Sequence, residues 1–203
     1  MTVNTIGILL FDGAEELDFV GPFEVFTMLS ATAKKRNESV ENNVVLISQD
    51  GEDITAAKGM RIGVEYSIQN APKLDVLCIP GGSGTRTQIH NKELVDWVAK
   101  TATTCTWVTS VCTGSFILAA AGLTDGKNIT THWAATEEFF ELGLKGNMHK
   151  NVRYVNDGNL VTSAGVSAGI DMALWLTGQM YSIDLARATQ RAMEYDPAPP
   201  YAE

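Results

Sequence analysis

Cys112 is the residue in this sequence best suited to nucleophilic chemistry. It follows the apolar segment Trp107–Val111 and precedes Thr113-Gly114, so a buried strand is expected to turn sharply into a helix there. This pattern is typical of a nucleophile elbow, in which the reactive atom stands above a sheet at the start of a helix. A helix N-terminus favours the thiolate, which predicts a lowered pKa for the Cys112 thiol. The alternative interpretation is a small buried hydrophobic residue ahead of a helix.

Asp18 is the best candidate for proton transfer. It lies between Leu17 and the apolar pair Phe19-Val20, so its carboxyl group is expected to be partly buried. Burial raises the pKa of a carboxyl group, and such a group can pass a proton to and from a reacting centre. An exposed acid on a helix is the alternative. Glu15 and Glu16 are expected to be solvated in the first helical turn, where carboxylates suit the helix dipole.

A glycine-rich turn offers backbone donors. The run Gly81-Gly82-Ser83-Gly84 follows an apolar strand and lacks the Lys-Ser/Thr ending of a phosphate-binding loop. Its free N–H groups could form half of an oxyanion-type site, with the amide of Thr113 as the other half. Taken alone, a glycine-rich turn is weak evidence for such a site.

The other cysteines and histidines have simpler interpretations. Cys78 lies inside an apolar run and Cys105 precedes a strand, so both are expected to be packing residues. His132 could orient or activate a thiol, or it could be a hydrogen-bonded packing histidine. His90 and His149 occur in polar stretches and are expected at the surface.

Strand-like and helix-like segments alternate from end to end. The expected strands are Val3–Phe11, Val44–Ser48, Asp75–Ile79, Trp107–Val111 and a hairpin of Val152–Val155 with Leu160–Ser163. The expected helices are Glu15–Ser30, Lys92–Thr101, Ser115–Ala121, Ala168–Tyr181 and Asp184–Tyr195, before a non-helical tail from Asp196 to Pro200. Apolar strands alternating with helices indicate a mostly parallel sheet covered on both faces. Sites in such sheets form at the carboxyl ends of strands, which selects Phe11–Asp18, Pro80–Thr85 and Val111–Gly114.

The amino-acid composition argues against several classes of protein. The 203 residues include 24 acidic and 15 basic side chains, for a formal net charge of −9. This balance argues against nucleic-acid partners and anionic membranes, which require clustered cations. We expect one globular domain over residues 1–203, with no signal peptide and no membrane span. Three cysteines fit neither a disulfide framework nor a zinc site, so a reducing cytoplasm and no bound metal are expected.

Several motifs together resemble the ThiJ/PfpI superfamily, also called class I glutamine amidotransferase-like, and most closely its isocyanide hydratase branch. The resemblance covers almost the whole chain. The motifs are Leu17-Asp18-x-x-Gly21-Pro22, Ile79-Pro80-Gly81-Gly82-Ser83-Gly84, Val111-Cys112-Thr113-Gly114, Thr130-Thr131-His132-Trp133, Gly165-Val166-Ser167-Ala168-Gly169-Ile170-Asp171 and Tyr195-Asp196-Pro197-Ala198-Pro199-Pro200.

The resemblance implies a homodimeric, flavodoxin-like three-layer α/β sandwich without a cofactor. Cys112 matches the family nucleophile and Asp18 its acidic partner, while Gly82 and Thr113 match positions whose amides line the site. Gly81 and His132 are expected next to these residues. Protease-like and glyoxalase-like members often carry His after the cysteine, so Thr113 argues against protease activity. The chain ends soon after Tyr201, so no helix-turn-helix domain of a regulator is expected.

These parts suggest hydration of an isocyanide to an N-substituted formamide through a covalent thioimidate. Cys112 would attack the isocyanide carbon, and Asp18 would protonate that carbon and then activate water. Two alternatives stay open at this point. One is a glyoxalase- or deglycase-type reaction on reactive carbonyl compounds. The other is a non-catalytic redox sensor or ligand-binding domain that responds to oxidation of Cys112.

Overall fold

A seven-stranded sheet forms the centre of the computed structural model, which describes residues 2–197. The strand order is β10-β11-β7-β6-β1-β2-β5, and every pair is parallel except the β10–β11 hairpin. The strands are β1 (Thr2–Leu9), β2 (Val40–Ser48), β5 (Tyr66–Ser67), β6 (Val76–Ile79), β7 (Trp107–Val111), β10 (Tyr154–Asp157) and β11 (Leu160–Ser163). The mostly parallel sheet predicted from the sequence is therefore confirmed.

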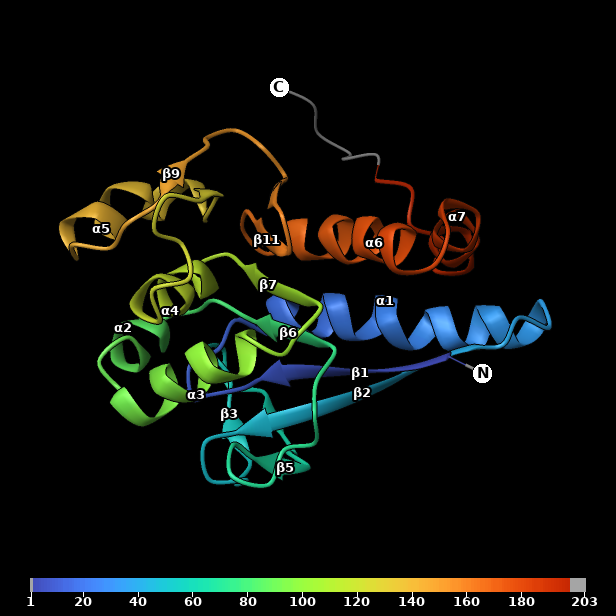
Figure 1. The fold of residues 1–203 in the computed structure, drawn as a ribbon, viewed down its shortest axis with the longest axis horizontal. Coiled ribbons are helices and arrows are strands. Elements are labelled where there is room, and N and C mark those ends of the chain that lie inside the picture. Colours follow the sequence, from blue (N-terminus) through green and yellow to red (C-terminus); the bar gives the residue numbers. More distant parts are fainter. Residues whose placement is uncertain (1, 198–203) are drawn as a thin grey trace.

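Helices cover both faces of this sheet, as Figure 1 shows. One face carries α1 (Glu16–Lys35), α6 (Ala168–Met180) and α7 (Ile183–Ala192); the other carries α2 (Thr85–Gln88), α3 (Lys92–Ala102) and α4 (Gly114–Ala120). On the first face, Phe26 of α1 and Leu176 of α6 pack with Ile6 of β1. On the second, Leu94 of α3 and Ile117 of α4 belong to the larger core cluster. The result is the expected three-layer α/β sandwich.

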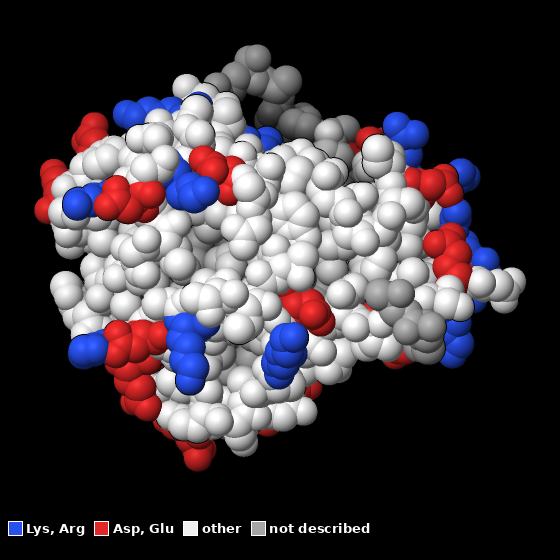
Figure 2. Space-filling model, in the orientation of Figure 1, with Lys and Arg blue, Asp and Glu red and all other residues white. Residues whose placement is uncertain are grey.

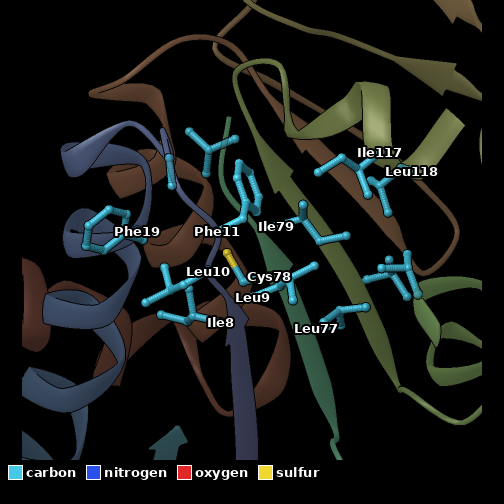
Figure 3. Close-up of a cluster of buried hydrophobic side chains, with 14 of the residues drawn as sticks. Ile8, Leu9, Leu10, Phe11, Phe19, Leu77, Cys78, Ile79, Ile117 and Leu118 are labelled. Carbon is cyan, nitrogen blue, oxygen red and sulfur yellow. The ribbon is translucent and has the colours of Figure 1, made fainter. Parts of the chain in front are cut away.

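The largest hydrophobic cluster in the described part of the chain includes side chains at the carboxyl ends of β1 and β6, some of which Figure 3 shows. All four residues of β6 are buried, because helices cover the sheet on both faces. Cys78 has no exposed surface and lies among apolar side chains that include Leu9 and Phe11. Cys105 is buried in the same cluster. Both cysteines are thus packing residues, as predicted.

The main differences from the sequence-based expectations are at element ends and in short elements. Helix α1 continues to Lys35, five residues beyond the expected end, because Leu29 and Ala33 pack against Leu185 of α7. The hairpin of β3 (Ile54–Thr55) and β4 (Arg61–Ile62) was not expected, and strands of two residues have no periodicity to detect. Other short elements missed for this reason are β5, α2, β8 (Asn128–Ile129), η1 (Trp133–Ala135), α5 (Thr136–Glu141) and β9 (Asn147–Met148).

The C-terminal helix ends earlier than expected. Helix α7 stops at Ala192 instead of Tyr195, and Asp196 and Pro197 are not helical. The remainder of the proline-rich tail, residues 198–203, lies outside the described part of the chain.

Acidic and basic side chains are interspersed on the face of the molecule drawn in Figure 2. That face has no broad field of Lys and Arg of the kind that binds nucleic-acid phosphates. Within residues 2–197, no helix combines the length and the apolar character needed to cross a membrane.

Candidate active site

Three chain segments meet at the carboxyl ends of β7, β6 and β1, which are neighbours in the sheet. The Gly84 N–H donates to the Gly13 carbonyl oxygen at 3.1 Å, and the Glu15 N–H donates to the Gly81 carbonyl oxygen at 2.9 Å. The Gly82 N–H reaches the Thr113 hydroxyl at 3.1 Å. The segments selected from the sequence therefore do meet in one place.

Cys112 occupies a strained turn between β7 and α4. Its φ of +55° lies in the left-handed region, which is unfavourable for a residue with a side chain. Hydrogen bonds hold it there: its N–H group lies 3.1 Å from the carbonyl oxygens of both Ser163 and Ala164. Its own carbonyl oxygen accepts from the Thr131 hydroxyl at 3.0 Å and the Ser115 hydroxyl at 3.2 Å. The sharp turn expected of a nucleophile elbow is present.

Asp18 is fully buried within the first turn of α1. The Gly81 N–H donates to its Oδ2 at 2.9 Å, whereas Oδ1 accepts no hydrogen bond from residues 2–197. Burial raises the pKa of the Asp18 carboxyl to about 7, although the Gly81 and Val166 amides and the Cys112 side chain act to lower it. A carboxyl group with this pKa can both donate and accept a proton near neutral pH. The buried carboxyl predicted from the sequence is confirmed.

The pKa of Cys112 departs from the prediction of a lowered value. Burial, followed by repulsion from the Asp18 carboxylate, raises the pKa of the thiol to about 12. The Thr113 N–H and hydroxyl groups act in the opposite direction. Helix α4 has only seven residues, and its dipole does not outweigh burial beside a carboxylate. Because Asp18 repels the thiolate only when ionised, a proton on Asp18 makes ionisation of Cys112 easier.

The Gly82 amide is placed differently from the expectation of a free donor. Gly82 has a φ of +116°, and a Cβ there would lie 2.3 Å from the Gly13 carbonyl oxygen, so only glycine fits. Its N–H group donates to Oγ1 of Thr113. The Gly82 amide therefore has an intramolecular hydrogen-bond partner in this structure. The Thr113 N–H group, in contrast, interacts with the Cys112 sulfur and lowers the pKa of the thiol.

A cavity of about 500 Å³ opens over Cys112. It is lined by Glu15, Lys58, Gly82, Arg86, Cys112, Thr113, His132, Ala134, Ala135 and Val166. Asp18 does not line the cavity and has no exposed surface. The cavity can thus admit a small molecule to the sulfur while the carboxyl group stays out of bulk water.

Glu15 and Glu16 are not the solvated acids that the sequence suggested. Their side chains are only 20% and 15% exposed, because the β3–β4 turn covers them. The side chain of Lys58 in this turn forms an ion pair with Glu15. The backbone N–H group of Lys58 donates a hydrogen bond of 2.7 Å to Oε1 of Glu16. No local pattern in the sequence placed Lys58 at the site, since its position depends on the way the hairpin folds back.

Arg86 is a second residue that sequence reasoning missed. Its guanidinium group forms a two-pronged ion pair with Glu138 and lies 5.1 Å above the Phe116 ring. It also donates to the Gly82 carbonyl oxygen at 3.1 Å and to Oγ1 of Thr113 at 3.3 Å. Arg86 therefore connects the glycine turn, the segment after Cys112 and helix α5.

Val166, the second residue of the Gly165–Asp171 motif, has an unusual backbone conformation. Its φ is +53°, a rare conformation for a β-branched residue. It lines the cavity, and its N–H group lowers the pKa of the Asp18 carboxyl group. A branched residue in this conformation could not be identified from the sequence, because the strain depends on the surrounding structure.

His132 lies at the cavity wall but makes no hydrogen bond to Cys112 in the described structure. Its Nδ1 accepts from the Ala134 N–H at 3.2 Å and caps the short helix η1. His90 and His149 are exposed, as predicted. Within residues 2–197, no three His, Cys, Asp or Glu side chains form a group that could hold a metal ion.

Known proteins resemble this chain over most of its length. Isonitrile hydratase of Pseudomonas putida is 37% identical over 196 residues, which are 97% of this chain and 80% of that protein. The HTH-type transcriptional regulator GbdR of Pseudomonas aeruginosa is 28% identical over 193 residues, which are 95% of this chain but 51% of the regulator.

Solved structures agree with the fold described above. A THiJ/PfpI family protein from Pseudomonas syringae has a TM-score of 0.87 and 30% identity, covering 99% of this chain and 78% of that one. Drosophila melanogaster DJ-1beta has a TM-score of 0.81 at 18% identity, covering 97% of this chain and 100% of the other, and shows the fold alone. The model of the DJ-1/PfpI family matches residues 4–179. With most of its length matched by that model, the chain belongs to the DJ-1/PfpI family.

Proposed function

We propose that this chain is an isocyanide hydratase, a lyase that adds water to an isocyanide and releases an N-substituted formamide. The observation that carries the proposal is the placement of a buried carboxyl group, Asp18, beside a cysteine in a strained turn, Cys112. The similarity to the isonitrile hydratase of Pseudomonas putida supports it, since isonitrile is another word for isocyanide.

The two groups supply what the reaction needs. An isocyanide carbon accepts a nucleophile and then a proton, and neither step requires a cofactor of its own. Cys112 is the cysteine that lines the cavity, whereas Cys78 and Cys105 are buried in the core. Asp18 has a pKa of about 7, so it can take the thiol proton and give it up again within one turnover.

The first half of the reaction forms a covalent adduct. The Cys112 thiol passes its proton to Asp18 as the sulfur bonds to the isocyanide carbon. Asp18 then delivers this proton to the same carbon. The product is a thioimidate, R–N=CH–S–Cys112, and Asp18 is again a carboxylate. Covalent catalysis of this kind divides one difficult addition into two easier ones.

The second half uses Asp18 as a base toward water. Asp18 takes a proton from water as the oxygen bonds to the carbon, and the π electron pair of the C=N bond moves to nitrogen. A second water molecule then carries that proton from Asp18 to nitrogen. As the C–S bond breaks, Asp18 accepts the hydroxyl proton, and the formamide R–NH–CHO leaves. Return of this proton to sulfur restores the starting state.

Formamide release is the test that separates this proposal from the two alternatives. Purified protein should convert phenyl isocyanide to N-phenylformamide, detected by chromatography and mass. Release of lactate from methylglyoxal without formamide would favour a glyoxalase-type enzyme. Oxidation of Cys112 in the absence of turnover on either compound would favour a redox sensor.

We further propose that the chain forms a homodimer and works in the cytoplasm. The support for a dimer includes the exposed apolar residues Leu17 and Val20 on α1, which are 36% and 38% exposed. Phe11 and Phe26, by contrast, are buried within the subunit. Sedimentation at micromolar concentration should give a species of twice 21.9 kDa, and a monomer of 21.9 kDa would contradict the dimer.

A further inference from the structure

His132 has one ring nitrogen occupied and one available. Its Nδ1 accepts a hydrogen bond from the Ala134 N–H at 3.2 Å. A neutral imidazole that accepts at Nδ1 carries its proton at Nε2, so Nε2 is a donor. No residue between 2 and 197 forms a hydrogen bond with Nε2. His132 is one of the residues that line the cavity over Cys112, so this donor belongs to a residue of the candidate site.

The surrounding residues hold the ring in place. A Cβ at Gly165 would lie 2.1 Å from Cδ2 and 3.0 Å from Nε2 of His132, so the ring edge packs directly on this glycine. The ring also lies 5.7 Å from that of Trp133, with 32° between their planes. The preceding residue, Thr131, donates to the Cys112 carbonyl oxygen at 3.0 Å. The donor is therefore preorganised relative to Cys112 rather than mobile.

The burial of Asp18 determines how a substrate must lie, if the proposed function holds. Asp18 protonates the isocyanide carbon from a position with no exposed surface. The nitrogen and its substituent cannot enter that closed side, so they extend into the open cavity. His132 is one of the residues that line this cavity.

We propose that His132 donates a hydrogen bond from Nε2 to the nitrogen of the covalent adduct during attack by water. At that step the C=N electron pair moves to nitrogen, and a fixed donor stabilises the developing charge. His132 keeps its proton throughout, and the proton that Asp18 takes from the attacking water reaches nitrogen through a second water molecule in the open cavity. The role differs from that of a base for the thiol, because Nδ1 is engaged with the backbone and Nε2 already carries hydrogen.

Two substitutions test the donor. In His132→Asn, the amide oxygen can accept a hydrogen bond near the position of Nδ1, but no N–H group extends as far as the position of Nε2. Gln carries an N–H group near the position of Nε2. We expect His132→Asn to slow formamide release by about 10²-fold, the usual effect of removing one donor, and His132→Gln to recover at least about tenfold of it. His90→Asn, at an exposed position, is the control.

The step affected distinguishes a donor to the adduct from a base for the thiol. In single-turnover experiments, His132→Asn should form the thioimidate on Cys112 at the wild-type rate and accumulate it, as seen by intact-protein mass. Slow adduct formation with no accumulation would overturn the proposal, as would wild-type turnover in His132→Asn. Equal loss in the Asn and Gln variants would also contradict it.

Gly165 provides a variant that moves the ring without removing it. Gly165 does not have a positive φ, so alanine is compatible with its backbone, and the three atoms nearest to the added Cβ all belong to His132. Gly165→Ala should slow adduct hydrolysis in wild type and have no further effect in the His132→Asn background. Such non-additivity is the mark of two residues that act through one group. Independent, additive effects would contradict the proposal.

A spectroscopic measurement separates this proposal from the proposed function. Ring ¹⁵N NMR of the resting protein, assigned by comparison with His132→Asn, should show a protonated Nε2 and an unprotonated Nδ1. An Nδ1–H tautomer would overturn the His132 proposal even if the wild type hydrates isocyanides. A wild-type protein that shows the expected tautomer but releases no formamide would overturn the proposed function, and with it the role of His132.

Discussion

The N–H group of Gly81 donates a hydrogen bond of 2.9 Å to Oδ2 of Asp18, which fixes one carboxyl oxygen and leaves Oδ1 without a hydrogen-bond partner among the described residues. The glycine turn after β6 thus orients the acid that follows β1. An anchored carboxyl group beside the Cys112 side chain is suited to hold a proton that moves during a reaction.

Replacing Cys112 by Ser or Ala should abolish formamide production without unfolding the protein. A serine hydroxyl is a much weaker nucleophile than a thiolate, and alanine has no nucleophile at all. Cys78→Ala and Cys105→Ala should keep the wild-type rate, with a loss of stability of about 1 kcal/mol each as small cavities form. Steady-state rates on all four variants check this, with circular dichroism as the folding control. Substantial activity in a Cys112 variant would end the covalent mechanism.

Replacing Asp18 by Asn should lower the turnover rate about 10²- to 10⁴-fold, because an amide keeps the shape but cannot transfer a proton. Asp18→Glu should also lose activity, since the longer side chain displaces the carboxyl group from the Gly81 amide. The rate of formamide formation is the measurement. The matched control is Glu24→Gln, an exposed acid on the same helix. An Asp18→Asn variant within a few-fold of wild type would refute the acid–base role.

The pH dependence of kcat/KM should report the pair formed by Asp18 and Cys112. With a pKa of about 7 for Asp18 and about 12 for Cys112, the pair carries one proton between these values and two below pH 7. The mechanism starts from the one-proton state, so kcat/KM should fall as pH drops through about 7.

Charges at the cavity rim should shift the pH at which kcat/KM falls to half of its maximum. The Glu15 carboxylate raises the pKa of Asp18 and is paired with Lys58. Glu15→Gln should therefore shift the midpoint to lower pH, whereas Lys58→Met should shift it to higher pH by exposing the Glu15 charge. Lys92→Met, on the surface of α3, is the control that should leave the profile unchanged. Shifts in the reverse directions would show that this ion pair does not act on Asp18.

The same carboxyl group should make the protein less stable at alkaline pH. The pKa of Asp18 rises from 3.8 in the unfolded chain to about 7 in the folded protein, so the folded state holds the proton more tightly. Its stabilising contribution is complete below pH 3.8 and is lost as pH rises through 7. At pH 8 the ionised, buried carboxylate lowers the free energy of unfolding, by an amount on the order of 1–4 kcal/mol.

Asp18→Asn removes this titration, so the stability of the variant relative to wild type should increase from pH 4 to pH 8. Urea denaturation at several pH values measures the difference. A constant difference between the two proteins over this range would show that Asp18 titrates normally in the folded state. A gain in stability with a loss of turnover would be the expected signature of a functional buried acid.

The order of the apolar segments determined most of the fold. Residues such as those of β6 are apolar without alternation, which predicts strands buried on both faces, and parallel strands place their carboxyl ends at one edge. That rule by itself places Asp18, the glycine turn and Cys112 at one edge of the sheet. The short hairpin β3–β4 escaped prediction, because two-residue strands have no periodic signal.

Only the tertiary structure decided the electrostatics of the site. The sequence suggested a lowered pKa for Cys112 from the helix that follows it, whereas burial beside the Asp18 carboxylate raises that pKa. It suggested solvated acids at Glu15 and Glu16, yet a turn more than 40 residues away in sequence covers them and contributes Lys58. Local patterns identify which residues carry chemistry. Burial and long-range contacts set their protonation, because the energy of a charge depends on everything that replaces the water around it.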